Sequence, residues 1–181
     1  MKTLSFKIFL LVIILSSIFI TRTGNMLPIL VASHFGVSGA ANGWMPREMY
    51  VRFMLGFAIG LPLLLMFVTM RGLNNSDAHA RIRLPNREYW LDPVRSVATI
   101  EYLQGHMAWF GILVVVFLSV VHWLVIVANH SVPAGLPSAL FLECLAVFLV
   151  AVGVWNIVLL RRFRTMPPEH HFVNHENGER L

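Results

Sequence analysis

The chain has 181 residues, of which 57% are hydrophobic and only 13% are charged, and its formal net charge is +5. Soluble domains carry about 25% charged residues, so this composition excludes a protein whose surface lies mostly in water. The basic residues lie beside apolar runs, which indicates lipid headgroups as their partners and gives no support for nucleic-acid binding. The single cysteine, Cys144, excludes an intramolecular disulfide and a cysteine metal motif.

Four apolar runs are long enough to cross a bilayer as helices, which takes about 17–25 residues each. They cover residues 4–21, 53–70, 107–128 and 138–160. Helices are required because lipid satisfies no backbone hydrogen bonds. The first run is followed by Arg22 and lacks a small-residue cleavage site, so we expect an uncleaved anchor. We predict an all-α membrane protein with one four-helix domain over residues 1–164 and a polar, disordered tail over residues 165–181.

The basic residues divide unevenly between the two ends of these runs. Eleven of the 14 lysines and arginines lie near the N-terminus, between the second and third runs, or after the fourth. Only Arg22, Arg47 and Arg52 lie at the opposite end. Because positive residues concentrate on the cytoplasmic side of membrane helices, we predict that both termini are cytoplasmic. The first and third connections are then extracytoplasmic.

The first connection carries the most distinctive polar pattern of the chain. The pattern consists of Pro28, His34, Phe35, Gly39, Asn42, Gly43 and Trp44. Asn-Gly is a strong turn dipeptide, and prolines at 28 and 46 bracket the segment. We expect a small loop element with an extended stretch over residues 30–35, a turn over residues 36–43, and its aromatic side chains at the headgroup level.

This pattern resembles the N-terminal domain of unknown function of SdpI-type bacterial membrane immunity proteins. In that family a membrane helix precedes a proline, a histidine with an aromatic residue, a glycine and a Gly-Trp turn, and the likeness covers residues 4–70. The family has a proline, an asparagine and an aspartate where this chain has Ala32 or Ser33, Gly36 and Asn42. The resemblance implies a multi-pass protein of the bacterial inner membrane. Some relatives act in signalling or in self-protection against a secreted toxin, which implies an extracytoplasmic peptide or toxin as partner.

Four polar side chains are candidates for a ligand or proton site: His34, His122, Glu143 and Asn129. His34 is either a ligand contact or a histidine that bonds loop backbone. His122 and Glu143 lie within apolar runs, where ionisable residues are costly and therefore functional candidates. Their depths of roughly 10 Å and 8 Å are similar, so we predict a His122–Glu143 hydrogen bond. Ser119, His122 and Asn129 share one helix face by the 3.6-residue period.

The predicted His122–Glu143 pair has three interpretations: a clasp between helices, a proton or ligand site, or a metal site completed by His34 or His130. Histidine and carboxylate suit zinc, but no tight ligand spacing is present, so we expect no metal and no cofactor.

The connection between the second and third runs has its own pattern. Arg87, Tyr89 and Trp90 form either an interfacial anchor or a partner-docking loop. Asp92-Pro93 is typical of a helix start, and we expect an interfacial helix there before the chain turns inward at Met107.

The second run contains Gly56 and Gly60, a spacing that favours close helix packing within the bundle or in a homodimer. We expect Pro62 to kink this helix. No nucleophile–base or phosphate-loop signature occurs in the chain. We therefore expect a non-enzymatic protein that binds or senses a ligand at the extracytoplasmic face. The alternatives are an accessory subunit of a larger membrane complex and a small proton-coupled transporter using His122 and Glu143.

Overall fold

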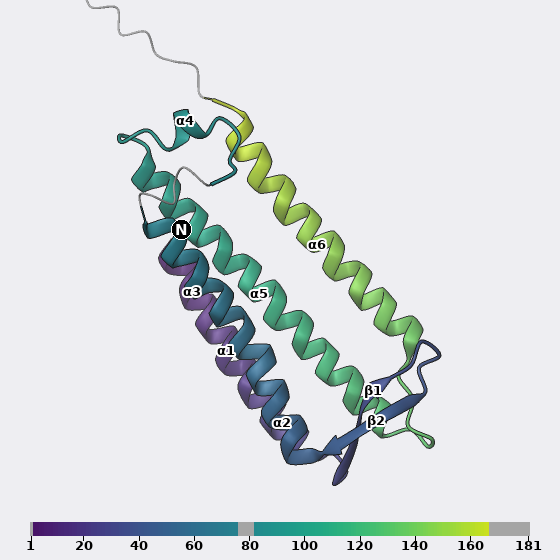
Figure 1. Ribbon diagram of the computed structural model, residues 1–181. Coiled ribbons are helices and arrows are strands. Elements are labelled where there is room, and N and C mark those ends of the chain that lie inside the picture. The colour runs from purple at the N-terminus through teal and green to yellow at the C-terminus, as the bar shows by residue number, and fades with distance from the viewer. Residues whose placement is uncertain (1, 76–81, 167–181) are drawn as a thin grey trace, which may run out of the picture.

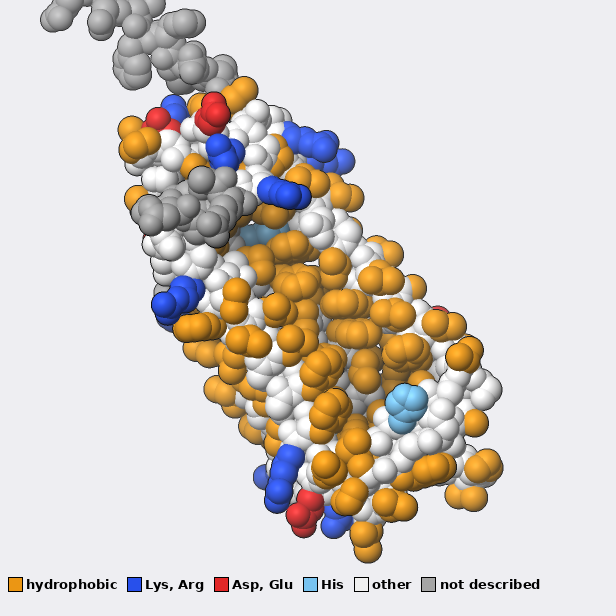
Figure 2. Space-filling view, viewed as in Figure 1, with side chains coloured by type: hydrophobic (Ala, Val, Ile, Leu, Met, Phe, Trp, Pro, Cys, Tyr) orange, Lys and Arg blue, Asp and Glu red, His pale blue; other side chains and the backbone are white. Residues whose placement is uncertain are grey.

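The structure, a computed structural model, describes residues 2–75 and 82–166 (Figure 1). Within these residues four helical segments are long and apolar enough to cross a membrane, as the sequence predicts. They are α1 (Lys2–Gly24), the continuous segment α2 (Arg47–Leu55), η1 (Gly56–Gly60) and α3 (Leu61–Asn74), then α5 (Ser96–Asn129) and α6 (Ser138–Arg164). On the face shown in Figure 2, hydrophobic side chains cover the middle and lysines and arginines lie toward the two ends.

The helices extend beyond the apolar runs that predict them, most of all in α5. This helix has 34 residues and begins at Ser96. The backbone carbonyl of Asp92 accepts hydrogen bonds from the amides of Arg95 and Ser96, which forms the turn before the helix. A separate interfacial helix before Met107 is therefore a wrong prediction. No proline separates Ser96 from Met107, so the intrahelical hydrogen bonds continue into the membrane span.

The predicted irregularity at Pro62 takes the form of a π-helical segment, η1 (Gly56–Gly60). Proline has no N–H, so the carbonyl four residues earlier, that of Ala58, lacks its usual donor. A π-helical turn shifts the hydrogen-bond pairing by one residue and accommodates such a gap.

The connection between α1 and α2 forms an antiparallel hairpin of β1 (Leu30–Phe35) and β2 (Ala41–Pro46). The extended stretch over residues 30–35 is confirmed, and the sheet is an addition to the predicted all-α fold. The turn is shorter than predicted, because Asn42 and Gly43 lie within β2. Gly39 supplies the positive φ, 82°, that this turn requires.

Helix α1 packs most extensively against α5, and the core lies between α1, α2, α5 and β1. The hairpin lies at one end of the bundle (Figure 1). The start of α1, the end of α6 and the short helix α4 (Arg87–Trp90) lie at the opposite end. Helix α6 packs mainly against α5, with Asn86 and Trp90 bonded to its end, and its only buried side chain is Phe163. The site residues at the hairpin end are therefore fixed mainly by α1, α2 and α5.

Candidate functional site

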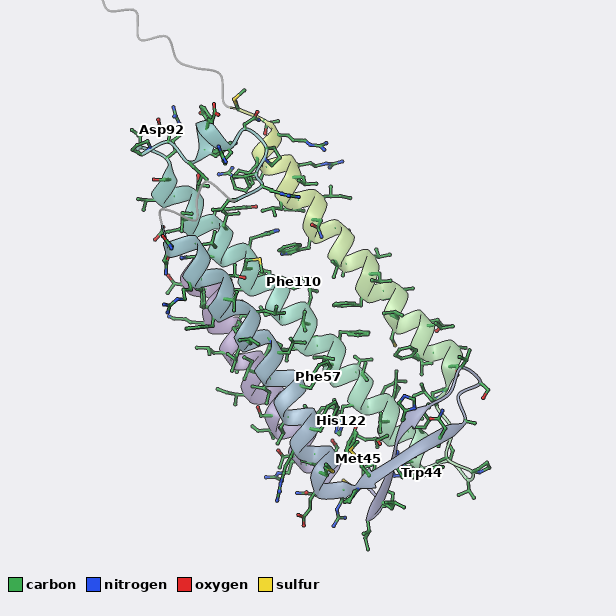
Figure 3. All side chains as sticks on the ribbon, viewed as in Figure 1. Trp44, Met45, Phe57, Asp92, Phe110 and His122 are labelled. Carbon is green, nitrogen blue, oxygen red and sulfur yellow. The ribbon has the colours of Figure 1, made fainter. Side chains whose placement is uncertain are left out.

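His122 is fully buried near the hairpin end of α5, where α1, α2 and α5 meet (Figure 3). Its Nδ1 lies 2.9 Å from the hydroxyl of Tyr50 on α2, and its Nε2 lies 2.9 Å from the hydroxyl of Thr23 on α1. The Tyr50 ring stacks against the imidazole, and the Phe19 ring meets it edge-on. One imidazole thus joins three helices.

The hydrogen-bond directions in this cluster follow from its donors. The Thr23 hydroxyl has one proton, which it donates to the backbone carbonyl of Phe19 at 2.6 Å. Thr23 must therefore accept from His122, which places the ring proton on Nε2. Nδ1 then accepts from the Tyr50 hydroxyl. Every donor in the chain from Tyr50 through His122 and Thr23 to Phe19 has an acceptor, so the cluster is a closed network.

The predicted His122–Glu143 hydrogen bond is wrong, since both ring nitrogens of His122 bond to Tyr50 and Thr23. Glu143 lies instead in a groove between α5 and α6. The short α5–α6 connection does make these helices neighbours, but it does not determine which face of α5 meets α6. The pair required by the transporter alternative is therefore not formed.

The polar stripe on α5 exists but faces α1 and the hairpin. The Ser119 hydroxyl lies 2.7 Å from that of Ser16 on α1. At the end of α5, the side-chain oxygen of Asn129 accepts from the Ala32 amide at 2.8 Å, and its nitrogen donates to the Ala32 carbonyl at 2.9 Å. The Asn129 side chain thus bonds to β1 as the backbone of a neighbouring strand would, and it holds the hairpin against the bundle.

Several motif residues contact one another within the hairpin. The Nδ1 of His34 lies 2.6 Å from the side-chain oxygen of Asn42. His34 pairs with Gly43 across the strands, and a Cβ at Gly43 would lie 2.9 Å from the Cβ of His34. His34, Asn42 and Trp44 are exposed, Phe35 is half-buried, and Pro28 is an exposed residue just before β1. Loop contacts therefore account for His34 and Gly43.

Gly39 brings the hairpin turn against the connection between α5 and α6. The amide of Leu136 donates to the Gly39 carbonyl at 2.8 Å, and Ala40 pairs with Gly135. A Cβ at Gly39 would lie 2.5 Å from the Leu136 carbonyl oxygen. This contact was not predicted, because the two segments are about a hundred residues apart and carry no pairing signal.

A cavity of about 630 Å³ lies between the hairpin turn and the α5–α6 connection. Its walls include Ser38, Ala41 and Trp44 from the hairpin and Ser131, Pro133 and Leu136 from the connection. Backbone polar groups and hydroxyls thus face an indole side chain that is 54% exposed. Such a wall can form hydrogen bonds to a ligand and cover an apolar group of it.

At the opposite end, the predicted interfacial loop binds the end of α6. The indole nitrogen of Trp90 and the side-chain nitrogen of Asn86 both donate to the Phe163 carbonyl, at 3.0 Å and 3.1 Å. The guanidinium of Arg95 lies 4.1 Å from the centre of the Tyr89 ring. Arg87 lies in the same short helix, α4. Trp90 is thus a contact within the chain, and Asn86 is a contact that the sequence does not indicate.

A second histidine clasp, between α5 and α6, was also missed. The indole nitrogen of Trp155 donates to the His106 carbonyl at 2.9 Å, and the His106 ring donates from Nε2 to the Trp155 carbonyl at 3.1 Å. The two rings stack with their centres 4.5 Å apart. The sequence signal for this clasp is His106, an ionisable residue directly before the apolar run over residues 107–128.

Gly56 and Gly60 make no close contact with other helices in the part of the chain that the structure describes. A Cβ added to either glycine would meet no heavy atom within 4 Å. The prediction that they pack closely inside the bundle is therefore wrong, and only the homodimer alternative remains for them. Gly111 takes that role instead, since the ring of Phe9 on α1 lies against it.

Neither a protein-family model, nor a curated protein, nor a solved structure matches the chain. Within residues 2–75 and 82–166, no group of three His, Cys, Asp or Glu side chains is arranged to hold a metal ion. The resemblance to the SdpI-type domain stays a prediction that rests on the loop motif.

Proposed function

We propose that this is a non-enzymatic, multi-pass protein of the bacterial cytoplasmic membrane that binds an extended polypeptide at its extracytoplasmic face. The observation that carries the proposal is the cavity of about 630 Å³ beside Trp44, an open hollow bordered by the hairpin and the α5–α6 connection. The uneven distribution of lysine and arginine supports an extracytoplasmic hairpin end and cytoplasmic termini.

The hairpin offers a polypeptide an unpaired strand edge beside this cavity. In the described part of the chain β2 pairs with β1 alone, so its other edge has backbone N–H and C=O groups without strand partners. The outer side of β1 differs, because Asn129 occupies the Ala32 amide and carbonyl. Addition of a strand to such an edge is an established way to bind peptides.

The attachment of the hairpin supports a preformed site. Besides Asn129, the guanidinium of Arg47 donates to the carbonyls of Asn25 and Leu27, each at 3.0 Å. These bonds fix β1 and the base of the hairpin before a ligand arrives, which lowers the entropy cost of binding. A peptide toxin or signalling peptide is the ligand class that the SdpI-type resemblance favours, and the function would then be immunity or signalling.

Photo-crosslinking in living cells tests this proposal directly. A benzoylphenylalanine at position 44, on the cavity wall, should give a discrete adduct with a polypeptide that mass spectrometry identifies. The same probe at Val94, exposed at the opposite end of the bundle, should give none. Failure of the position-44 probe to capture any polypeptide, in a protein that accumulates normally, would contradict the proposal.

Two substitutions separate binding from folding. His34→Ala and Trp44→Ala remove exposed side chains of the hairpin, so the protein should still accumulate in the membrane. With the crosslinker placed at Ser131, on the other wall of the cavity, either substitution should reduce the adduct. An unchanged adduct in both variants would argue against recognition by the hairpin.

The second candidate, an accessory subunit of a larger membrane complex, is favoured by one observation. No residue in the apolar window of α6 is buried within the structure, so a partner helix has room to bind there. Such a subunit should co-purify with a fixed partner in mild detergent. Purification of this chain by itself would count against it.

A further inference from the structure

The groove between α5 and α6 differs from the cavity beside Trp44 in place and in chemistry. Its volume is about 360 Å³, and it lies within the membrane-spanning part of both helices. Its walls are apolar apart from Glu143, and they include Val116, Phe117, Val120, Leu140, Val147 and Phe148. The rings of Phe117 and Phe148 stack 4.3 Å apart and join the two helices at the groove. Val147 is 70% exposed, so the groove is accessible from the lipid side.

Glu143 is the one ionisable wall residue of this groove apart from the thiol of Cys144. Within the described residues Glu143 forms no hydrogen bond and no ion pair. The helix dipole stabilises negative charge in the first turn of a helix. Glu143 is the sixth residue of α6, so it lies beyond that turn. A carboxyl group beside an apolar wall therefore has no donor from its own chain.

The depth of Glu143 corresponds to the boundary between headgroups and acyl chains. Helix α6 has 27 residues and is therefore about 40 Å long, close to the whole thickness of a bilayer with its headgroups. Glu143 follows the helix start by five residues, or about 8 Å. The groove continues from there to Ala151, about 12 Å further into the hydrocarbon layer.

We propose that this groove binds a phospholipid with a primary amine headgroup. The ammonium group donates hydrogen bonds to Glu143, and one acyl chain lies along the apolar wall between Phe117 and Val147. Charge complementarity selects this occupant. An anionic headgroup would be repelled by the carboxylate, and none of the described residues that line the groove is a lysine or arginine. A choline headgroup has the positive charge but no N–H to donate.

Native mass spectrometry of the delipidated full chain tests the proposal. The protein is titrated in mild detergent with phosphatidylethanolamine, phosphatidylcholine and phosphatidylglycerol of identical acyl chains. We expect phosphatidylethanolamine to bind about tenfold more tightly than phosphatidylcholine, because a hydrogen bond to a charged group is lost in the latter. Glu143→Gln should remove this preference. Glu101→Gln changes an exposed carboxylate at the other end of α5 and should leave it intact.

A second pair of variants tests the apolar wall. Val147→Trp fills the groove and should weaken binding of all three lipids, whereas Leu149→Trp changes an exposed α6 residue outside the groove and should not. If Val147→Trp fails to accumulate, the Glu143→Gln comparison decides by itself. Equal binding of the amine and choline lipids to the natural chain would overturn the proposal, and so would a preference that survives Glu143→Gln.

A second copy of the chain is the competing occupant of the groove. Cys144 is the only cysteine of the chain and lines the groove, so oxidation with copper phenanthroline in vesicles reports on it. An efficient Cys144–Cys144 cross-link would show that two α6 helices meet at this face and would overturn the lipid assignment. The proposal expects this cross-link to be absent or inefficient in vesicles.

Discussion

Single residues connect distant segments at both histidine clusters and at the hairpin turn. His122 uses both ring nitrogens to join α1 and α2 to α5, and Gly39 brings the hairpin turn to the backbone of Leu136. In each case the side chain, or its absence, suits a contact with a segment far away in sequence. These residues set the shape of the hairpin end without needing a ligand.

Gly39→Ala should destabilise the protein by about 1–3 kcal/mol, because it combines a left-handed backbone with a steric conflict. The added Cβ would lie 2.5 Å from the Leu136 carbonyl oxygen, at a φ of 82°. The measurement is the free energy of unfolding in an SDS titration. Gly36→Ala is the matched control, since its Cβ would meet nothing closer than 3.5 Å. Equal effects of the two substitutions would contradict this account of Gly39.

Tyr50→Phe should lower the free energy of unfolding by about 0.6–1.7 kcal/mol, the range measured for hydrogen bonds between membrane helices. It removes the hydroxyl that donates to His122 and leaves Nδ1 buried without a donor. A double-mutant cycle with His122→Phe should give a coupling energy of the same size. Tyr89→Phe removes a hydroxyl that has no hydrogen bond to any described residue, and it should have little effect. A coupling energy near zero would show that the Tyr50–His122 bond does not stabilise the fold.

The hairpin and α6 are attached to α5 in different ways. The hairpin is held by paired hydrogen bonds from Asn129 and by the turn at Gly39. Helix α6 is held near its end by the His106–Trp155 clasp and by the bonds of Asn86 and Trp90 to the Phe163 carbonyl. Between this fixed end of α6 and the hairpin end, α6 contacts α5 through side chains. The groove with Glu143 lies in this part of the helix pair.

Asn129→Ala should loosen the hairpin without unfolding the bundle. It removes the two bonds to Ala32, and we expect the β1 amides to exchange with solvent about fivefold faster, as expected for a loss of ~1 kcal/mol. Hydrogen exchange followed by mass spectrometry measures this change. Asn156→Ala is the control, because the Asn156 amide bonds only to Val152 of its own helix. Unchanged exchange of β1 would show that Asn129 does not hold the hairpin.

The whole molecule is a bundle with unequal ends. The hairpin, the cavity beside Trp44 and the α5–α6 connection occupy one end, whereas α4 and the end of α6 occupy the other (Figure 1). The arginines of α6, Arg161, Arg162 and Arg164, lie in its last turn. With the orientation proposed from the positive-inside rule, the proposed polypeptide site and Glu143 would lie toward the outer leaflet.

Reporter fusions should confirm this orientation. Alkaline phosphatase fused after Pro133 should be active, because the enzyme works only outside the cytoplasm. The same enzyme fused after Asn75 should be inactive, and green fluorescent protein at the C-terminus should be fluorescent. Phosphatase activity after Asn75 would show the opposite topology, with both proposed sites on the cytoplasmic side.

Much of this structure could be predicted from local features of the chain. Hydropathy located the four spans, the extended stretch over residues 30–35 is a strand, and the 3.6-residue period placed Ser119, His122 and Asn129 on one face. These properties are local, because span length and helix periodicity depend on residues close in sequence. The predicted tail over residues 165–181 lies almost entirely outside the described residues, except for Thr165 and Met166.

Only the tertiary structure decided what each polar face meets. The short α5–α6 connection predicts that these helices are neighbours, but it leaves their rotation about their own axes open. That rotation directs the polar stripe toward α1 and the hairpin, and it separates His122 from Glu143. The rotation of the α2–η1–α3 segment likewise leaves Gly56 and Gly60 without a close neighbour among the described residues. Rotation is set by packing against all neighbouring helices at once, so the sequence by itself determined four helices long and apolar enough to cross a membrane, whereas the packed bundle determined which polar side chains meet.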